Sequence, residues 1–90
     1  MKGTNETVVT ARVLVRCQRE ILGFSTEYSL WVEFDCSQPH YRIRVERGAE
    51  SSSCDVGEGL INAVHFFEAV VNGEVFPYSL TEIAEDFFGT

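Results

Sequence analysis

The chain has few of the features that mark several large classes of protein. Its 90 residues include only two prolines, too few for a proline-rich linker or a collagenous protein. No apolar run approaches the roughly 18–20 residues that a membrane-spanning helix needs. The opening segment, residues 1–6, has no apolar stretch of the kind that a secretory signal requires. These absences lead us to expect a cytoplasmic protein that does not bind a membrane.

Cysteine is also scarce. The three cysteines, Cys17, Cys36 and Cys54, form no Cys-x-x-Cys pair, which both a zinc ribbon and a thioredoxin-type redox site need. An odd number of isolated cysteines is typical of free thiols in a reducing compartment, where they behave as small buried hydrophobic residues. We therefore expect free thiols and neither a metal ion nor another cofactor.

Charge is distributed unevenly along the chain. All seven Lys and Arg residues lie within positions 1–47, whereas positions 48–90 hold eight acidic residues and no Lys or Arg. The net charge of −7 opposes binding to a phosphate backbone, so a nucleic-acid partner is not expected. Charge asymmetry between two halves of a chain indicates a partner-binding surface.

Ninety residues leave room for one core, so we expect a single α+β domain over residues 1–90, with residues 1–6 flexible. Alternation of apolar and polar side chains predicts strands over residues 8–17, 24–35 and 41–47. Because short connections join these strands, we expect an antiparallel meander.

The segments around these strands are less regular. Residues 19–23 suit a turn or an irregular connection. Pro39 breaks the chain before the third strand, because proline has no N–H to donate to a central ladder. Residues 49–56 fit either a fourth, edge strand or a loop, so the sequence leaves three or four strands open.

Two helices follow in the sequence pattern. Residues 58–72 have helical spacing, and Asn72-Gly73 predicts a helix end with Gly73 in the left-handed conformation. Ser79-Leu80-Thr81-Glu82 matches a capping box, with Ser79 as the N-cap of a second helix. The expected apolar faces are Leu60, Ile61, Val64, Phe67 and Val71 for the first helix, and Leu80, Ile83, Ala84 and Phe87 for the second. The fold class expected is therefore α+β: a three- to four-stranded antiparallel meander followed by two helices packed on one face.

The carboxy-terminal half resembles a known family. A short strand is followed by a longer helix that ends in Asn-Gly, and then by Pro77, Ser79-Leu80 and a final Ile-Ala-Glu-Asp-Phe-Phe run at 83–88. This order is similar to that of a family of short uncharacterised proteins, a domain of unknown function, from clostridia and related Gram-positive bacteria, which commonly close on a Glu-Asp-Phe-Leu helix. The resemblance covers residues 28–88, most closely from residue 54 onward. It implies no activity, because no catalytic or binding residues are established for that family.

The candidate interaction surface comes from the sheet face opposite the helices. Trp and Arg dominate the binding energy of protein interfaces, so we select Arg12, Arg16, Trp31, Arg42 and Arg44 as its residues. If the helices cover one face as an acidic layer, the arginines should lie on the other. Alternation would place on that open face Arg12, Leu14, Arg16, Ser29, Trp31, Glu33, Arg42, Arg44 and Glu46. Two other interpretations are an ordinary solvated face with Arg–Glu cross-strand pairs and an RNA platform on which Trp31 stacks a base.

Residue types that could carry catalysis are present without a supporting motif. His40 and His65 lack the repeated spacing of metal ligands. Cys54 with one histidine would make a minimal nucleophile–base pair, but no flanking signature accompanies it. We therefore expect no enzyme activity and no catalytic residues.

Together these patterns favour a small non-enzymatic protein-interaction module that uses its exposed sheet face. Its partner would be another protein or a second copy, as in a homodimer. The alternative is a regulatory domain that binds a small molecule or nucleic acid between helix and sheet. A third hypothesis is a hydrolase-like enzyme that uses Cys54 or His65.

Overall fold

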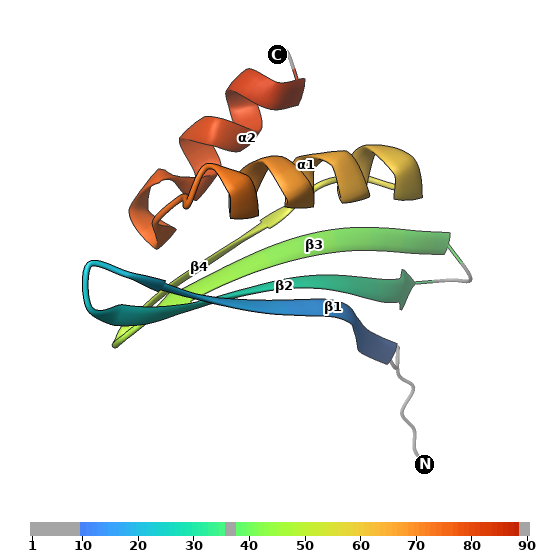
Figure 1. The fold of residues 1–90 in the computed structure, drawn as a ribbon. Helices are drawn as coiled ribbons and strands as arrows, with labels where there is room; N and C mark the ends of the chain where they lie inside the picture. The colour runs from blue at the N-terminus through green and yellow to red at the C-terminus, as the bar shows by residue number, and fades with distance from the viewer. Residues whose placement is uncertain (1–9, 36–37, 89–90) are drawn as a thin grey trace.

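The computed structural model describes residues 10–35 and 38–88, so the predicted flexibility of residues 1–6 lies outside the described residues. A four-stranded antiparallel sheet precedes two helices (Figure 1), which confirms the expected α+β class. The elements in chain order are β1 (Thr10–Ile21), β2 (Phe24–Asp35), β3 (Gln38–Arg47), β4 (Glu50–Asp55), α1 (Leu60–Asn72), the 3₁₀ turn η1 (Pro77–Ser79) and α2 (Leu80–Phe88).

The strands follow the chain order β1-β2-β3-β4, as expected of a meander. The uncertain segment 49–56 does form a strand, β4, at one edge of this sheet. Both helices lie on the same side of the sheet, and the described residues place no element on the other side (Figure 1). We call these two sides the helix side and the open face.

The connection between β1 and β2 differs from the predicted turn at 19–23. β1 continues to Ile21, and only Leu22 and Gly23 form the turn, with φ of 53° and 82°. Two consecutive residues with positive φ make the type I′ turn, whose twist matches that of the flanking strands. The prediction started the turn three residues too early, because Arg19 and Glu20 are polar residues of an edge strand rather than turn residues.

The sequence predicted that Pro39 ends the connection before the third strand, but Pro39 lies within β3, opposite Phe34 of β2. The amide of Tyr41, two residues later, donates towards β4 by binding the carbonyl of Gly57 at 2.8 Å. By alternation, the nitrogen of Pro39 also points to that side of β3. The β4 ladder reaches only as far as Arg42, so this proline occupies an edge position where a missing N–H costs nothing.

The core lies between the helices and the helix side of β2 and β3. Strands and helices contribute side chains that are fully or almost fully buried: Tyr28, Leu30, Ile43, Val45, Phe66, Val70 and Leu80. The hydroxyl of Tyr28 donates a hydrogen bond of 3.1 Å to the carbonyl of Val75, which ties β2 to the loop after α1. Burial of each large apolar side chain stabilises the fold by about 1.5–3 kcal/mol.

The buried face of α1 is rotated from the one that the sequence predicted. Leu60 and Ile61 are exposed, at 48% and 71%, whereas Phe66 is fully buried. The reason is that α1 packs against α2 as well as the sheet: the ring centroid of Phe66 lies 5.1 Å from that of Phe87 and 5.3 Å from that of Phe88. A helix with two neighbours buries a wider stripe than helical spacing over one sheet implies.

The helix ends also depart from the predicted caps. Gly73 is in the right-handed region with φ of −84°, and Glu74 takes the left-handed conformation with φ of 51°. Glycine fits at 73 because an added Cβ would lie 3.1 Å from the carbonyl oxygen of Ala69. Ser79 belongs to η1, where its amide donates to the carbonyl of Phe76, instead of preceding α2 as an extended N-cap.

Candidate interaction surface

The open face is shaped by a bulge in β1. Val13 lies directly opposite Trp31 of β2. Val15, two residues later, lies opposite Leu30, which makes Leu14 an extra residue in β1. An inserted residue moves the side chains that precede it to the other face of the sheet. In Figure 1 the first part of β1 bends away from the other strands.

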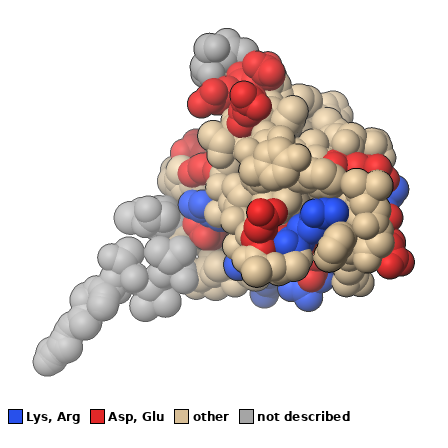
Figure 2. All heavy atoms as spheres, turned by 90° about the vertical axis from the view of Figure 1, so that its left-hand side faces the viewer, with Lys and Arg blue, Asp and Glu red and all other residues tan. Residues whose placement is uncertain are grey.

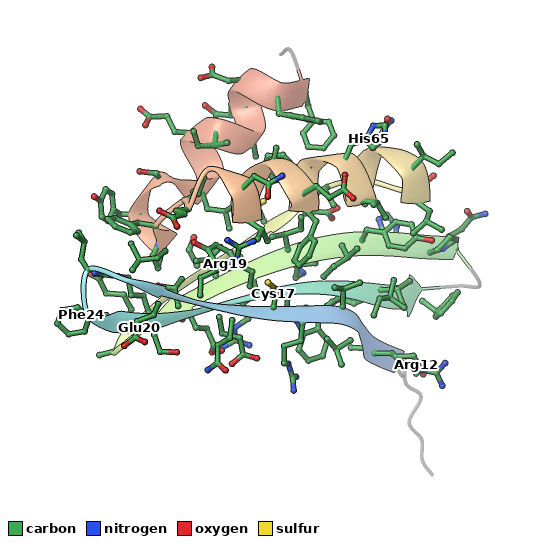
Figure 3. All side chains as sticks on the ribbon, viewed as in Figure 1. Arg12, Cys17, Arg19, Glu20, Phe24 and His65 are labelled. Carbon is green, nitrogen blue, oxygen red and sulfur yellow. The ribbon has the colours of Figure 1, made fainter. Side chains whose placement is uncertain are left out.

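This bulge corrects the predicted position of Arg12. Arg12 lies opposite Val32, which is buried on the helix side of β2, so Arg12 belongs to the helix side as well. Figure 3 shows it at the bent end of β1. Ala11 and Val13 take the places on the open face that alternation gave to Arg12 and to Leu14, the bulge residue.

The other four candidate residues do come together on the open face. Arg42 lies opposite Trp31, and Arg16 and Arg44 lie on either side of Ser29. They extend from β1, β2 and β3, and their backbone positions are fixed by the ladder that joins these strands. The sequence pattern therefore placed Arg16, Trp31, Arg42 and Arg44 on the correct face of the sheet and placed Arg12 on the wrong one.

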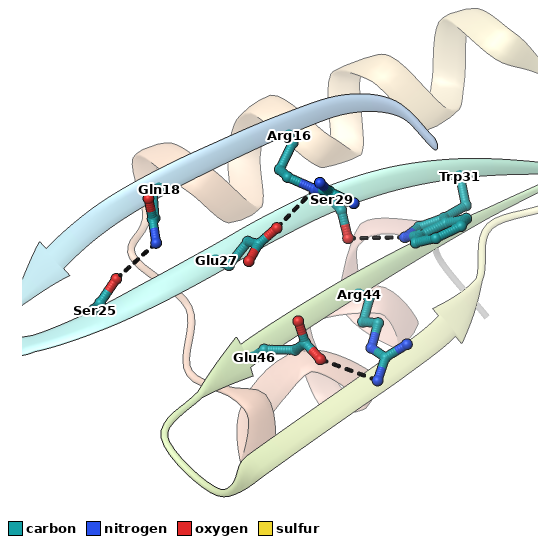
Figure 4. A network of polar contacts seen from close by, with 8 residues as sticks. All are labelled: Arg16, Gln18, Ser25, Glu27, Ser29, Trp31, Arg44 and Glu46. Atoms are coloured by element: carbon teal, nitrogen blue, oxygen red, sulfur yellow. Dashed lines mark hydrogen bonds and ion pairs between the residues drawn. The ribbon is translucent and has the colours of Figure 1, made fainter. Parts of the chain in front are cut away.

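Trp31, the single tryptophan of the chain, is half-buried at this centre. Its indole N–H donates a 2.8 Å hydrogen bond to the hydroxyl of Ser29 (Figure 4). This bond restrains the ring orientation, and Trp31 also lines a shallow hollow of about 150 Å³. The hollow is lined by Ala11, Trp31, Glu33, Arg42, Arg44 and Ser53.

Each arginine of the open face has a carboxylate partner, as Figure 4 shows for two of them. These partly exposed pairs are worth about 0.2–1 kcal/mol each. They also offset the repulsion between Glu27 and Glu46, which lie directly opposite each other. The shortest N···O distances are 2.7 Å for Arg16–Glu27, 3.5 Å for Arg42–Glu33 and 3.0 Å for Arg44–Glu46.

The open face does not carry all of the arginines that the charge distribution assigned to it. Arg19 and Arg47, like Arg12, lie on the helix side, and Figure 3 shows Arg19 there with Glu20 on the opposite side. Figure 2 shows acidic side chains gathered over the helices and basic ones lower, intermixed with acidic ones. Among the residues whose side chains the structure describes, the open face carries three arginines against five carboxylates, Glu20, Glu27, Glu33, Glu46 and Asp55.

Arg47 has a structural role that the sequence did not indicate. Its guanidinium carbon lies 4.8 Å from the ring centroid of Phe24 and 4.5 Å from that of Phe76. The same group donates a 3.4 Å hydrogen bond to the carbonyl of Ile21. Arg47 thus joins the β1–β2 turn to the segment before η1 through two cation–π contacts.

The potential catalytic residues are distributed over different parts of the fold. His65 lies on the surface of α1, away from the sheet (Figure 3). His40 lies at the end of β3 near two carboxylates, with N···O distances of 4.0 Å to Asp55 and 3.7 Å to Glu58. Of the residues the structure describes, no three His, Cys, Asp or Glu side chains form a group that could hold a metal ion.

Cys54 is half-buried on the helix side of β4. Burial raises the pKa of its thiol to about 11, with a further increase from Asp55 and an opposing effect from Arg42. A thiol with a raised pKa is protonated near neutral pH, which is the opposite of what a cysteine nucleophile needs.

Comparison of the chain with protein-family models, with curated proteins and with solved structures finds no match. The resemblance to the clostridial family therefore stays a prediction. Over the two described ranges, no helix has the length and apolar character needed to cross a membrane.

Proposed function

We propose that this domain is a non-enzymatic protein-interaction module and that its open face binds a second copy of the chain. The observation that carries the proposal is the position of Trp31. This ring is half-buried at the middle of the open face, opposite Arg42 and in the same hollow as Arg44. Trp and Arg are the residue types that most often anchor interfaces, where they fill desolvated pockets near the centre.

The charges of the open face support a second copy as the partner. Arg16 and Arg44 lie in one row across the strands, and Glu27 and Glu46 lie in the next row towards the β1–β2 turn. A two-fold axis that runs across the strands between these rows would place the arginine row of each copy over the glutamate row of the other, with Arg44 over Glu46. The same patch would then be complementary to itself.

The size of the face is sufficient for such a dimer. Strands about 4.8 Å apart and about ten residues long give this four-stranded face an area of roughly 600 Å² per copy. Two copies would bury about 1,200 Å², the lower limit for a specific interface. Face-to-face packing of two sheets is also the arrangement of β-sandwiches.

An ordinary solvated face is the competing interpretation, because every arginine of the open face already has an acidic partner. An RNA platform is less favoured, since the described part of the open face has more carboxylates than arginines. If the ion-paired open face is only solvated, the protein is a monomer. The solution mass therefore distinguishes a solvated face from one that forms a dimer.

The test is the solution mass, measured by size-exclusion chromatography with light scattering. We expect a dimer for the native chain and a monomer for the Trp31→Ala/Arg44→Glu double variant, with unchanged circular dichroism. Arg12→Glu is the matched control, since it makes the same charge change on the helix side and should remain dimeric. A native monomer at all concentrations, or a double variant that still dimerises, would refute the proposal.

Two further observations bear on the class and the location. The raised pKa of Cys54 supports a non-enzymatic role, because it disfavours the Cys54 nucleophile. Cys17 and Cys54, the two cysteines within the described residues, are free thiols, which supports a reducing compartment such as the cytoplasm.

A further inference from the structure

A shallow groove runs along β4 on the helix side of the sheet. It consists of two adjoining hollows of about 470 and 380 Å³, which share Thr81 in their lining. β4 and the residues that flank it form one wall, and η1 with α2 forms the other. This is a different surface from the open face, because α2 packs on the helix side (Figure 1).

β4 offers unpaired backbone groups along this groove. Across the described ranges, β4 is the last strand of the sheet and pairs only with β3. The amide of Val56, just after β4, donates to the carbonyl of Tyr41 in β3 at 2.8 Å. Because backbone groups alternate in direction along a strand, the residues two, four and six positions before Val56 also turn their amides and carbonyls towards β3. The residues in between, of which Ser53 is the central one, turn their amides and carbonyls outward. Such an edge is a template for one more strand.

A stripe of η1 and α2 faces the groove. Tyr78, Thr81, Glu85 and Phe88 line it and recur every three or four residues, which places them on one side of a helix. Tyr78 and Phe88 are 76% and 37% exposed, so two aromatic rings are available to a bound chain. A strand edge beside a helix with exposed apolar side chains is the arrangement that binds extended peptides by strand addition.

The charge of the groove indicates the chemistry of such a peptide. Glu50 and Glu85 line the two hollows, and neither lining includes Lys or Arg. Positions 48–90, which supply the entire lining, contain no Lys or Arg at all. Figure 2 shows acidic side chains clustered on the helical part of the molecule. Carboxylates around a groove favour a basic partner and repel an acidic one.

We infer that this groove binds an extended basic peptide from another protein, which adds a fifth strand to the sheet at β4. Its backbone pairs with the outward groups around Ser53. Its apolar side chains contact Tyr78 and Phe88, and its Lys or Arg side chains meet Glu50 and Glu85. The six residues of β4 accommodate a segment of similar length, about 20 Å when extended.

The first experiment selects ligands from a library of randomised peptides of about seven residues, displayed on phage and exposed to the immobilised native chain. We expect enrichment of sequences in which Lys or Arg alternates with apolar residues and proline is absent. No enrichment over a blank surface, or enrichment of acidic peptides, would overturn the proposal.

The second experiment measures the affinity of the enriched peptide by fluorescence anisotropy for two matched variants. Ser53→Ala and Ser53→Pro both remove the hydroxyl, but only proline removes the outward N–H, and an edge strand tolerates it. We expect Ser53→Pro to bind at least about tenfold more weakly than Ser53→Ala. Equal affinity of the two folded variants would exclude strand addition.

Two more measurements separate this groove from other interpretations. Glu85→Lys, on the exposed side of α2, should weaken binding about tenfold and reduce its salt dependence. If Ser53→Pro but not Ser53→Ala converted a dimer into a monomer, the occupant of the edge would be a second copy and the peptide proposal would be wrong. The Trp31→Ala/Arg44→Glu variant tests the open face separately, so failure of one proposal is distinguishable from failure of the other.

Discussion

The two faces of this sheet differ in what holds their side chains in place. On the helix side, Tyr28, Ile43 and Val45 are completely buried, and helices cover them. On the open face the arginines are partly exposed, and ion pairs with cross-strand or same-strand glutamates hold them. Apolar burial contributes several times more stability per residue than an exposed ion pair. The helix side therefore stabilises the fold, and the open face is free to serve an interaction.

The largest expected effect comes from breaking the helix side at Phe66. Phe66→Ala removes a fully buried ring that contacts Phe87 and Phe88, and should lower the free energy of unfolding by about 3–5 kcal/mol. Ile61→Ala, on the same helix but 71% exposed, should change it by less than about 0.5 kcal/mol. Urea unfolding followed by circular dichroism measures both. A larger loss for Ile61→Ala than for Phe66→Ala would mean that α1 packs with the face that the sequence predicted.

A smaller effect is expected from Tyr28→Phe, which removes one polar contact from the same side. The hydroxyl of Tyr28 donates to the carbonyl of Val75, and its loss leaves that carbonyl without this donor. We expect destabilisation by about 1–1.5 kcal/mol in urea unfolding. An unchanged midpoint would show that this bond does not hold the loop after α1 to β2.

The helix side should also make stability sensitive to alkaline pH. Burial raises the pKa of Tyr28, with a further increase from Glu74, and burial raises the pKa of Cys54 from 9.0 to about 11. Both groups are neutral when protonated, so the unfolded chain ionises at lower pH than the folded one. The stability that these two groups contribute is fully present below the pKa that each has in the unfolded chain. It is lost as the pH rises from that value to the higher pKa of the folded chain.

Urea unfolding at pH values below and above 9.0, the pKa that the Cys54 thiol has in the unfolded chain, measures this loss. The native chain should be less stable at the higher pH, and Cys54→Ala should reduce the difference. A stability that rises with pH over this interval would contradict the assigned burial of both groups.

The smallest effect is expected on the open face. Glu33→Gln weakens the ion pair with Arg42, whose 3.5 Å separation and partial exposure limit its energy. The free energy of unfolding should fall by at most about 0.5 kcal/mol, and less at high salt. A loss comparable to that of Phe66→Ala would mean that the open face, rather than the helix side, holds the fold together.

The sequence predicted element types and topology well, because alternation and helical spacing report directly on which side of an element is apolar. It placed Trp31, Arg42 and Arg44 on one face for the same reason. It placed Arg12 wrongly, because one bulge residue reverses alternation on everything before it. The only sign of that bulge is the run of three apolar residues at 13–15, which interrupts strict alternation.

Features that depend on contacts between distant segments could not be predicted. Arg47 between Phe24 and Phe76 joins residues that are far apart in sequence. The groove beside β4 requires the packing of α2 against β4, which no local pattern encodes. The acidic partner of each open-face arginine depends likewise on strand register, which the sequence does not show.

The fluorescence of Trp31 tests the central claim most directly, because the chain has no other tryptophan. Acrylamide quenching would be measured across a dilution series, in parallel with solution mass. If the open face binds a second copy, quenching should increase and the emission maximum should move to longer wavelength as the dimer dissociates. A dimer that dissociates without any change in Trp31 fluorescence, or a chain that remains monomeric throughout, would contradict the account.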